Sequence, residues 1–168
     1  QFKGAIFSSR QINDQIEVEE ELKYSMNYSR NLIEANLDPM VTISQGGKIM
    51  DVNQATEDAT GMPRNQLIGT DFSQYFTLPE KAMRGYQKTL FYGSLKDYPL
   101  TLKHVSGKTM EVLYNATVYR DNEGKVQGVF AAARNITKIK KANEALKLSE
   151  RHFRSLIENA LDLILVLN

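Results

Sequence analysis

The stretch TMEVLYNATVYR-DNEG-KVQGVFAAARNI, residues 109–136, decides the fold because it has the pattern of two long strands joined by a tight turn. Side chains along residues 109–120 alternate between two sets. One set is apolar apart from a tyrosine hydroxyl: Val112, Tyr114, Ala116 and Val118. Successive side chains of a strand point to opposite faces of a sheet, so this set is predicted to face the core. The DNEG segment is typical of a turn, and residues 125–136 form the return strand.

Three further strands are predicted upstream of this pair. Two short apolar runs, residues 40–44 and 48–52, flank a Gly-Gly pair and therefore predict a β-hairpin. Residues 97–105 form the third strand, which ends at a Ser-Gly turn. The chain thus supplies two strands early and three strands late.

Three helices are predicted between these two groups of strands. Asn53 is expected to cap a helix over residues 54–60. Pro63 opens a second short helix, and residues 79–92 form a longer one that Gly93 closes. Four apolar side chains of the longer helix are expected to share one face: Met83, Tyr86, Leu90 and Phe91. This order predicts an α+β fold, a five-stranded antiparallel sheet with helices packed against one face.

Long connecting helices are predicted on both sides of this unit, at residues 13–37 and 138–161, which contain neither Gly nor Pro. Positions spaced by three and four form a sparse seam along them, and the main apolar residues of this seam are Leu22, Met26, Ile33, Leu146, Phe153 and Leu156. Helices with so few apolar contacts are marginal alone. We therefore expect a partner helix, most simply in a homodimer.

The two ends of the chain repeat each other, since residues 4–44 match residues 128–168 position by position. Arg10, Leu32 and Asp38 recur as Arg134, Leu156 and Asp162, for example. A repeat of this kind predicts an array of similar units. We expect residues 1–12 to be the tail of an upstream unit, with a strand at 4–10. Residues 38–137 are then a complete unit, and 162–168 begin a downstream one.

Composition excludes several classes of function. The chain of 168 residues has a net charge of +1, so no basic excess favours nucleic acid. No apolar run approaches the ~20 residues of a membrane span, so direct membrane insertion is not expected. Cysteine is absent, which excludes disulfides, thiolate metal sites and cysteine nucleophiles. We find no catalytic set and no metal-ligand spacing, so this chain is not predicted to be an enzyme.

Several short motifs occur in a fixed order along the central unit. They are Gly47 to Asn53, Ala59-Thr60-Gly61, Leu67-Ile68-Gly69, Ser106-Gly107-Lys108 and Arg134-Asn135-Ile136-Thr137. Their order and spacing resemble a PAS domain with its trailing PAC segment. The resemblance implies a cytoplasmic sensor or relay module from a multi-PAS signalling protein, such as a sensor histidine kinase. Neighbouring PAS units and an output domain would then lie in the parent chain. The alternative is a ligand-free dimerisation and spacing module.

The resemblance also implies where a signal would leave the domain. The junction residues would be Asp38, Arg134, Asn135, Ile136 and Thr137. The family usually carries Asp in the last of its motifs, where this chain has Asn135. A charged contact at that position is therefore not expected here.

No cofactor is assigned by the sequence. Flavin adduct chemistry of the family needs a cysteine, and haem-binding members use a histidine from the long helix, which has none here. Small residues on the last strand nevertheless leave room for a small ligand. The predicted pocket residues are Tyr86, Leu90, Val112, Tyr114, Ala116, Ala131 and Ala133. The alternative is that Phe72, Tyr75, Phe76 or Phe91 fills the space, because empty cavities reduce stability.

Overall fold

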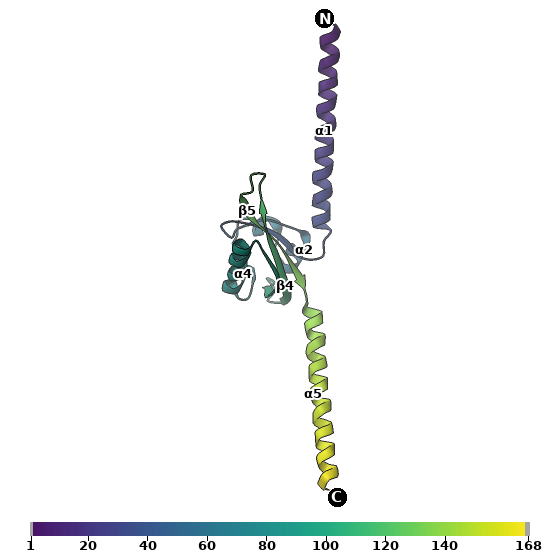
Figure 1. Cartoon of the computed structure of the whole chain (residues 1–168), viewed down its shortest axis with the longest axis vertical. Helices are drawn as coiled ribbons and strands as arrows, with labels where there is room; N and C mark the ends of the chain where they lie inside the picture. The colour runs from purple at the N-terminus through teal and green to yellow at the C-terminus, as the bar shows by residue number, and fades with distance from the viewer. Residues whose placement is uncertain (1, 167–168) are drawn as a thin grey trace.

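The computed structural model describes residues 2–166, with side chains described over residues 14–158, and consists of a central unit with a long helix at each end (Figure 1). The elements run in the order α1 (Phe2–Glu34), β1 (Met40–Ser44), β2 (Ile49–Val52), α2 (Gln54–Thr60), α3 (Arg64–Leu67), the 3-10 helix η1 (Phe72–Tyr75), α4 (Pro79–Tyr92), β3 (Ser94–Lys103), β4 (Thr109–Arg120), β5 (Val126–Asn135) and α5 (Thr137–Val166).

The five strands form one antiparallel sheet in the order β2-β1-β5-β4-β3. The stretch that decided the fold supplies β4 and β5, and β5 lies at the centre. Ala131 of β5 pairs with Val41 on one side and Ala116 on the other. The predicted five-stranded antiparallel α+β fold is confirmed.

The helices between β2 and β3 cover one face of the sheet and enclose the core. Asn53 caps α2 by accepting a hydrogen bond from the Thr56 amide, and Gly61 ends α2 with φ of +73°, as predicted. The core includes Val112, Tyr114 and Ala116 of the predicted inward set of β4, with Val112 and Tyr114 each 1% exposed, and Val118 packs against it partly buried. Periodicity in residues 109–120 therefore identified the buried face correctly.

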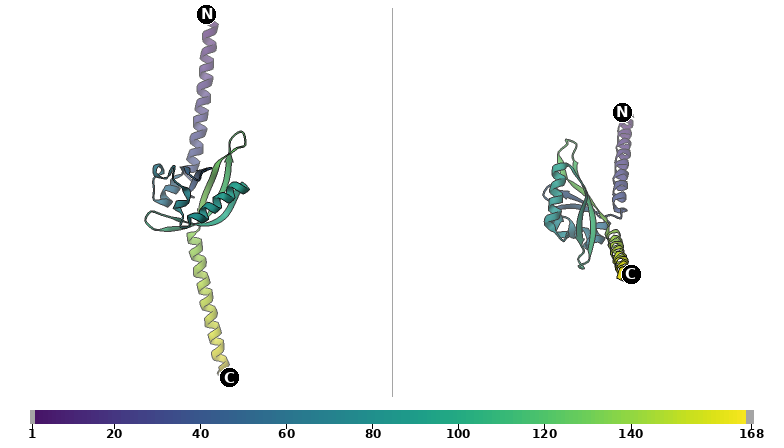
Figure 2. Two further views of the ribbon diagram at one scale, coloured as in Figure 1. Left: turned by 90° about the vertical axis from the view of Figure 1, so that its left-hand side faces the viewer. Right: turned by 60° about the horizontal axis from the view of Figure 1, so that its bottom comes forward.

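Helices α1 and α5 leave the central unit in opposite directions, and the chain ends lie at the two extremes (Figure 1). Turned views place both helices along the same side of the sheet unit (Figure 2). The strand expected over residues 4–10 is wrong, because these residues belong to α1. A strand needs a neighbour for its backbone groups, whereas a helix satisfies them within one segment.

Two details of the helical face also differ from the expectation. Phe91 is 81% exposed and does not share the buried face of α4 with Tyr86. Met83, Tyr86 and Leu90 follow helical spacing, whereas Phe91 is one further residue and about 100° around the axis. The 3-10 helix η1 was not predicted. Asp71 caps it by accepting from the Ser73 amide, and it places Phe72 and Tyr75 in the core.

Candidate functional site

A small cavity of about 40 Å³ lies between the sheet and the helical face. The strands contribute Val41, Ile49, Leu102, Tyr114 and the three alanines of β5, and the helical face contributes Thr56, Thr60, Leu67 and three aromatic side chains. Phe72, Tyr75 and Phe76 line this space, so aromatic rings occupy much of the volume that small β5 residues leave. The room that remains is far below the roughly 300 Å³ of an ordinary cofactor site.

Three of the predicted pocket residues line this cavity, namely Tyr114, Ala131 and Ala133. Val112 and Ala116 are buried in the core but away from it, and Leu90 is only partly buried. Tyr86 is also outside the lining, because its hydroxyl donates a 2.6 Å hydrogen bond to the carbonyl oxygen of Ser44. The predicted set therefore divides between the cavity and the surrounding core, and ligand binding by it stays a prediction.

Burial changes the chemistry of two of the three core tyrosines, Tyr114 and Tyr86. Desolvation raises the pKa of Tyr114 far above its ordinary value, and it raises the pKa of Tyr86 to a smaller extent. Burial disfavours the charged phenolate, so both side chains stay neutral at physiological pH. Neither is suited to act as a base.

Asn53 joins the end of α1 to the start of the sheet unit. Its side chain is fully buried, and its Oδ1 accepts hydrogen bonds from the Met40 amide at 2.9 Å and the Thr56 amide at 3.1 Å. Its Nδ2 lies within hydrogen-bond distance of three carbonyl oxygens around the end of α1, those of Ile33, Asn36 and Asp38. The sequence identified this residue as a helix cap, whereas the structure makes it the connection between α1 and the sheet.

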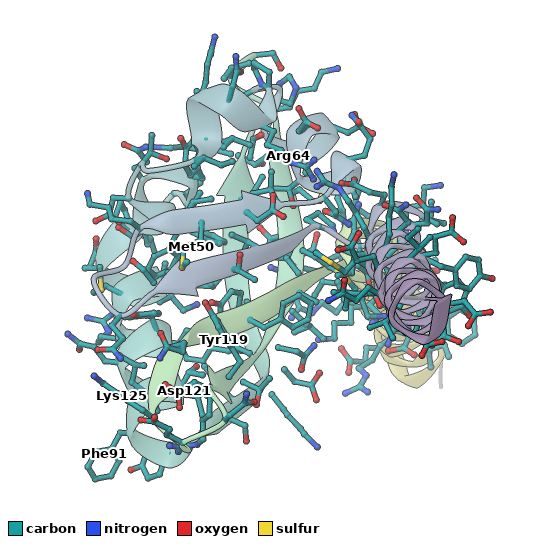
Figure 3. The ribbon with its side chains drawn as sticks, turned by 90° about the horizontal axis from the view of Figure 1, so that it is seen from above. Met50, Arg64, Phe91, Tyr119, Asp121 and Lys125 are labelled. Atoms are coloured by element: carbon teal, nitrogen blue, oxygen red, sulfur yellow. The ribbon has the colours of Figure 1, made fainter. Side chains whose placement is uncertain are left out.

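An ion pair supports the same junction. Glu34, the last residue of α1, pairs with Arg64 of α3, and its other carboxylate oxygen accepts from the Gln54 amide at 2.9 Å. The hydrogen bond from Arg64 holds the pKa of Glu34 below its ordinary value. Arg64 Nε also lies 3.2 Å from Asp51 Oδ1, a charge contact without hydrogen-bond geometry. Figure 3 shows Arg64 on the side of the unit nearer to α1.

Glu111 of β4 is the centre of the junction with α5. Its backbone carbonyl accepts from the Ile136 amide at 2.8 Å, and its amide donates to Thr137 Oγ1 at 3.0 Å. Its carboxylate accepts from Lys140 Nζ at 2.8 Å and from Thr101 Oγ1 at 3.0 Å. The first turn of α5 is therefore attached to β4 through Glu111, and Thr101 of β3 supports the same carboxylate.

Only some of the predicted junction residues lie around Glu111. Ile136 and Thr137 contact it directly, and Asn135 Oδ1 accepts from the Thr137 amide at 2.9 Å. Arg134 is an exposed residue of β5, and the carbonyl of Asp38 bonds Asn53 in the other junction. Asn135 carries no charge and so forms no ion pair itself, as the sequence indicated. The junction nevertheless contains an ion pair, which Glu111 forms with Lys140.

The helix-seam residues are exposed. Leu22, Met26 and Leu146 are between 59% and 66% exposed, and the other predicted seam positions, Ile33, Phe153 and Leu156, are also exposed. Within the described side chains, Tyr24 stacks on Tyr28 along α1 with ring centroids 6.4 Å apart. The apolar surface of both helices is thus available to a partner.

The described residues contain neither a helix fit to span a membrane nor a cluster of metal ligands. Over residues 2–166, no helix has the length and apolar character to cross a membrane. The side chains that the structure describes hold no group of three potential metal ligands among His, Cys, Asp and Glu.

Comparison with known proteins gives the family. A family model described as PAS domain matches residues 37–138, which covers the sheet and its helical face, including Asn53 and Glu111. The chain therefore belongs to the PAS domain family. No curated protein matches the sequence significantly.

Solved PAS domains share this fold. A PAS domain from Colwellia psychrerythraea aligns with a TM-score of 0.60 and 17% identity, covering 67% of this chain and 98% of that one. The PAS domain of an HTR-like protein from Haloarcula marismortui gives 0.59 and 19%, covering 71% and 98%. A PAS domain from a two-component sensor histidine kinase gives 0.58 and 16%, covering 67% and 97%.

Proposed function

We propose that this chain is a cytoplasmic sensor and relay module of a sensor histidine kinase, and that it passes changes in its interior to its helical connectors. The supporting observation is the pair of junctions at Asn53 and Glu111. Each ties the end of a connecting helix to the sheet unit through several side-chain contacts. A helix fixed in this way must respond when the strand beside it shifts.

The route between interior and helix is short. Ala131 lines the cavity, and four residues further along β5 the chain reaches Asn135, which hydrogen-bonds the start of α5. Ala133 lines the cavity too, and pairs with Tyr114 of β4, three residues beyond Glu111. A displacement of these strands by an occupant would therefore reach both strands that hold α5.

We propose a homodimer as the functional unit, with α1 and α5 each pairing with the same helix of a second copy. Their exposed apolar side chains support this proposal, since a solvated helix of this length gains stability by covering such a stripe. Packed helix pairs also switch by small rotations or shifts, which suits a relay.

The second candidate is a ligand-free module that only dimerises and separates its neighbours. The small, aromatic-lined cavity supports it. The Ala131→Val variant separates the two functions, because it adds two methyl groups at the cavity as an imitation of an occupant. A relay predicts changed amide NMR signals at residues 137–140, and a spacer predicts none. Ala132→Val is the control. Ala132 also borders the cavity, but its side chain alternates to the face of β5 opposite those of Ala131 and Ala133, so the added methyl groups point away from the cavity.

A further inference from the structure

Tyr114 carries a buried hydroxyl that has no hydrogen-bond partner in the described part of the chain. The residue is 1% exposed and lines the cavity. The other two tyrosines of the core are satisfied, because Tyr86 donates to Ser44 and the Tyr75 hydroxyl lies 2.9 Å from Thr70 Oγ1. Buried polar atoms are almost always paired in native proteins, so an exception beside a cavity indicates a missing partner.

Water is a poor candidate for this partner. A buried water needs two to four polar neighbours, and the cavity is lined mainly by apolar side chains. The two threonines in the lining are already engaged. Thr56 Oγ1 bonds the Met40 carbonyl at 2.8 Å, and Thr60 Oγ1 bonds the Thr56 carbonyl at 2.7 Å. A water beside Tyr114 would leave most of its own hydrogen bonds unmade.

The cavity suits a small neutral molecule with one polar atom. Its volume of about 40 Å³ holds about three water-sized groups, at roughly 10–15 Å³ each. No charged side chain lines it, so a charged ligand would lose its hydration without compensation. A tyrosine hydroxyl donates well to a carbonyl, hydroxyl or nitrile acceptor.

We propose that this cavity binds a neutral molecule of about three non-hydrogen atoms whose single acceptor takes the hydrogen bond of the Tyr114 hydroxyl. Small aldehydes and nitriles have this chemistry, because each has an acceptor and no O–H or N–H donor. The inference rests on the proposed sensor function and adds the class of ligand to it. The cavity also lies close to solvent, because Thr60 and Tyr75 of its lining also line a surface groove of about 710 Å³.

Acetonitrile and xenon are matched probes for this site, because both are small and only acetonitrile has an acceptor. We would titrate each into the protein with ¹³C-labelled alanine methyls and follow Ala131 and Ala133. Saturable shifts are expected with both probes in the wild type. In Tyr114→Phe, acetonitrile should bind about 5- to 10-fold more weakly, as one lost hydrogen bond implies, while xenon binds equally well.

The Tyr114→Phe variant keeps the ring and removes an unpaired hydroxyl, so we expect it to fold at least as stably as the wild type. A second variant, Ala131→Val, should weaken both probes by reducing the space. Equal acetonitrile binding by wild type and Tyr114→Phe would overturn the proposed anchor. No saturable shift with either probe would overturn the ligand class, yet the relay would survive if Ala131→Val still altered the signals of residues 137–140.

Discussion

Single residues carry the connections between the sheet unit and its helices. Asn53 uses its amide oxygen for the sheet and α2, and its amide nitrogen for the carbonyls that follow α1. Glu111 uses its backbone and its carboxylate to hold the first turn of α5. Asn53 and Glu111 thus each connect one long helix to the sheet unit, Asn53 at the end of α1 and Glu111 at the start of α5.

Asn53→Asp separates the two halves of the Asn53 contact. Aspartate keeps the oxygen that caps α2, but it places a second oxygen opposite the carbonyls of Ile33, Asn36 and Asp38. We expect a loss of about 3 kcal/mol in the free energy of unfolding, because buried acceptors would then face one another. Urea denaturation measures it. An unfolding free energy equal to that of the wild type in Asn53→Asp would show that the amide donors contribute nothing. Asn65→Asp, at an exposed position, is the control for the added charge.

Protonation of Glu111 should loosen the start of α5. The hydrogen bond from Lys140 holds the pKa of Glu111 below its ordinary value of 4.5. A lowered pKa in the folded state means that the contact stabilises at higher pH and is lost as the pH falls through that lowered value. The protection factors of amides 137–140, meaning the intrinsic exchange rate at each pH divided by the measured rate, should fall below pH 4.5 in the wild type when followed from pH 6 downward.

The Glu111→Gln variant provides the comparison. It keeps an acceptor for Thr101 and the backbone contacts with Ile136 and Thr137, and it removes the charge. Exchange at the start of α5 should be faster than in the wild type at pH 6 and should lose this pH step. Global stability should change by less than about 1 kcal/mol, since the pair is partly exposed. An unchanged pH step in Glu111→Gln would assign the effect to another group.

At the scale of elements, the sequence predicted what local periodicity and turn chemistry determine. The hairpin, the Asn53 cap, the length of α4 and the buried face of β4 all follow from residues close in the chain. Glu111 was missed because its partners Ile136 and Lys140 lie on a different element, and no local pattern marks them. The strand expected at residues 4–10 failed because pairing, rather than composition, makes a strand.

Surface features of the elements could not be predicted either. Met50 and Tyr119 belong to different strands and meet on the outer face of the sheet, with the Tyr119 hydroxyl 3.4 Å from the Met50 sulfur (Figure 3). Tyr119 alternates with the predicted inward set of residues 109–120, so it belongs to the outer face, but its partner there depends on strand order. The division of the predicted pocket has the same origin, because strand register decides which side chains face the cavity.

The seam on α5 makes a prediction at the element scale. Leu146 lies on the seam and Leu148 does not, although Leu148 is 69% exposed and chemically identical. Leu146→Glu should weaken dimerisation at least about tenfold, because two buried charges would meet across the helix pair. Leu148→Glu should leave it unchanged. Sedimentation equilibrium measures both, and equal effects of the two substitutions would contradict the seam.

At the scale of the whole molecule, the domain lies between two helices that extend in opposite directions (Figure 1). The interior cavity is small. Its lining includes residues of β4 and β5, the strand that carries Glu111 and the strand that leads into α5. This arrangement suits a module in which a small displacement of the strands around the cavity changes the position of the long helix α5. The central claim is therefore mechanical coupling between the cavity and α5.

The most direct test is a distance between two spin labels within one chain, at Lys48→Cys in the β1–β2 turn and Lys147→Cys on α5. The chain has no cysteine of its own, so the labels attach only at these two positions. Mixing the labelled protein with an excess of unlabelled protein suppresses distances between labels on different copies. We predict that Ala131→Val shifts or broadens the distance distribution, whereas Ala132→Val leaves it as in the wild type. Identical distributions in all three folded proteins would contradict the relay.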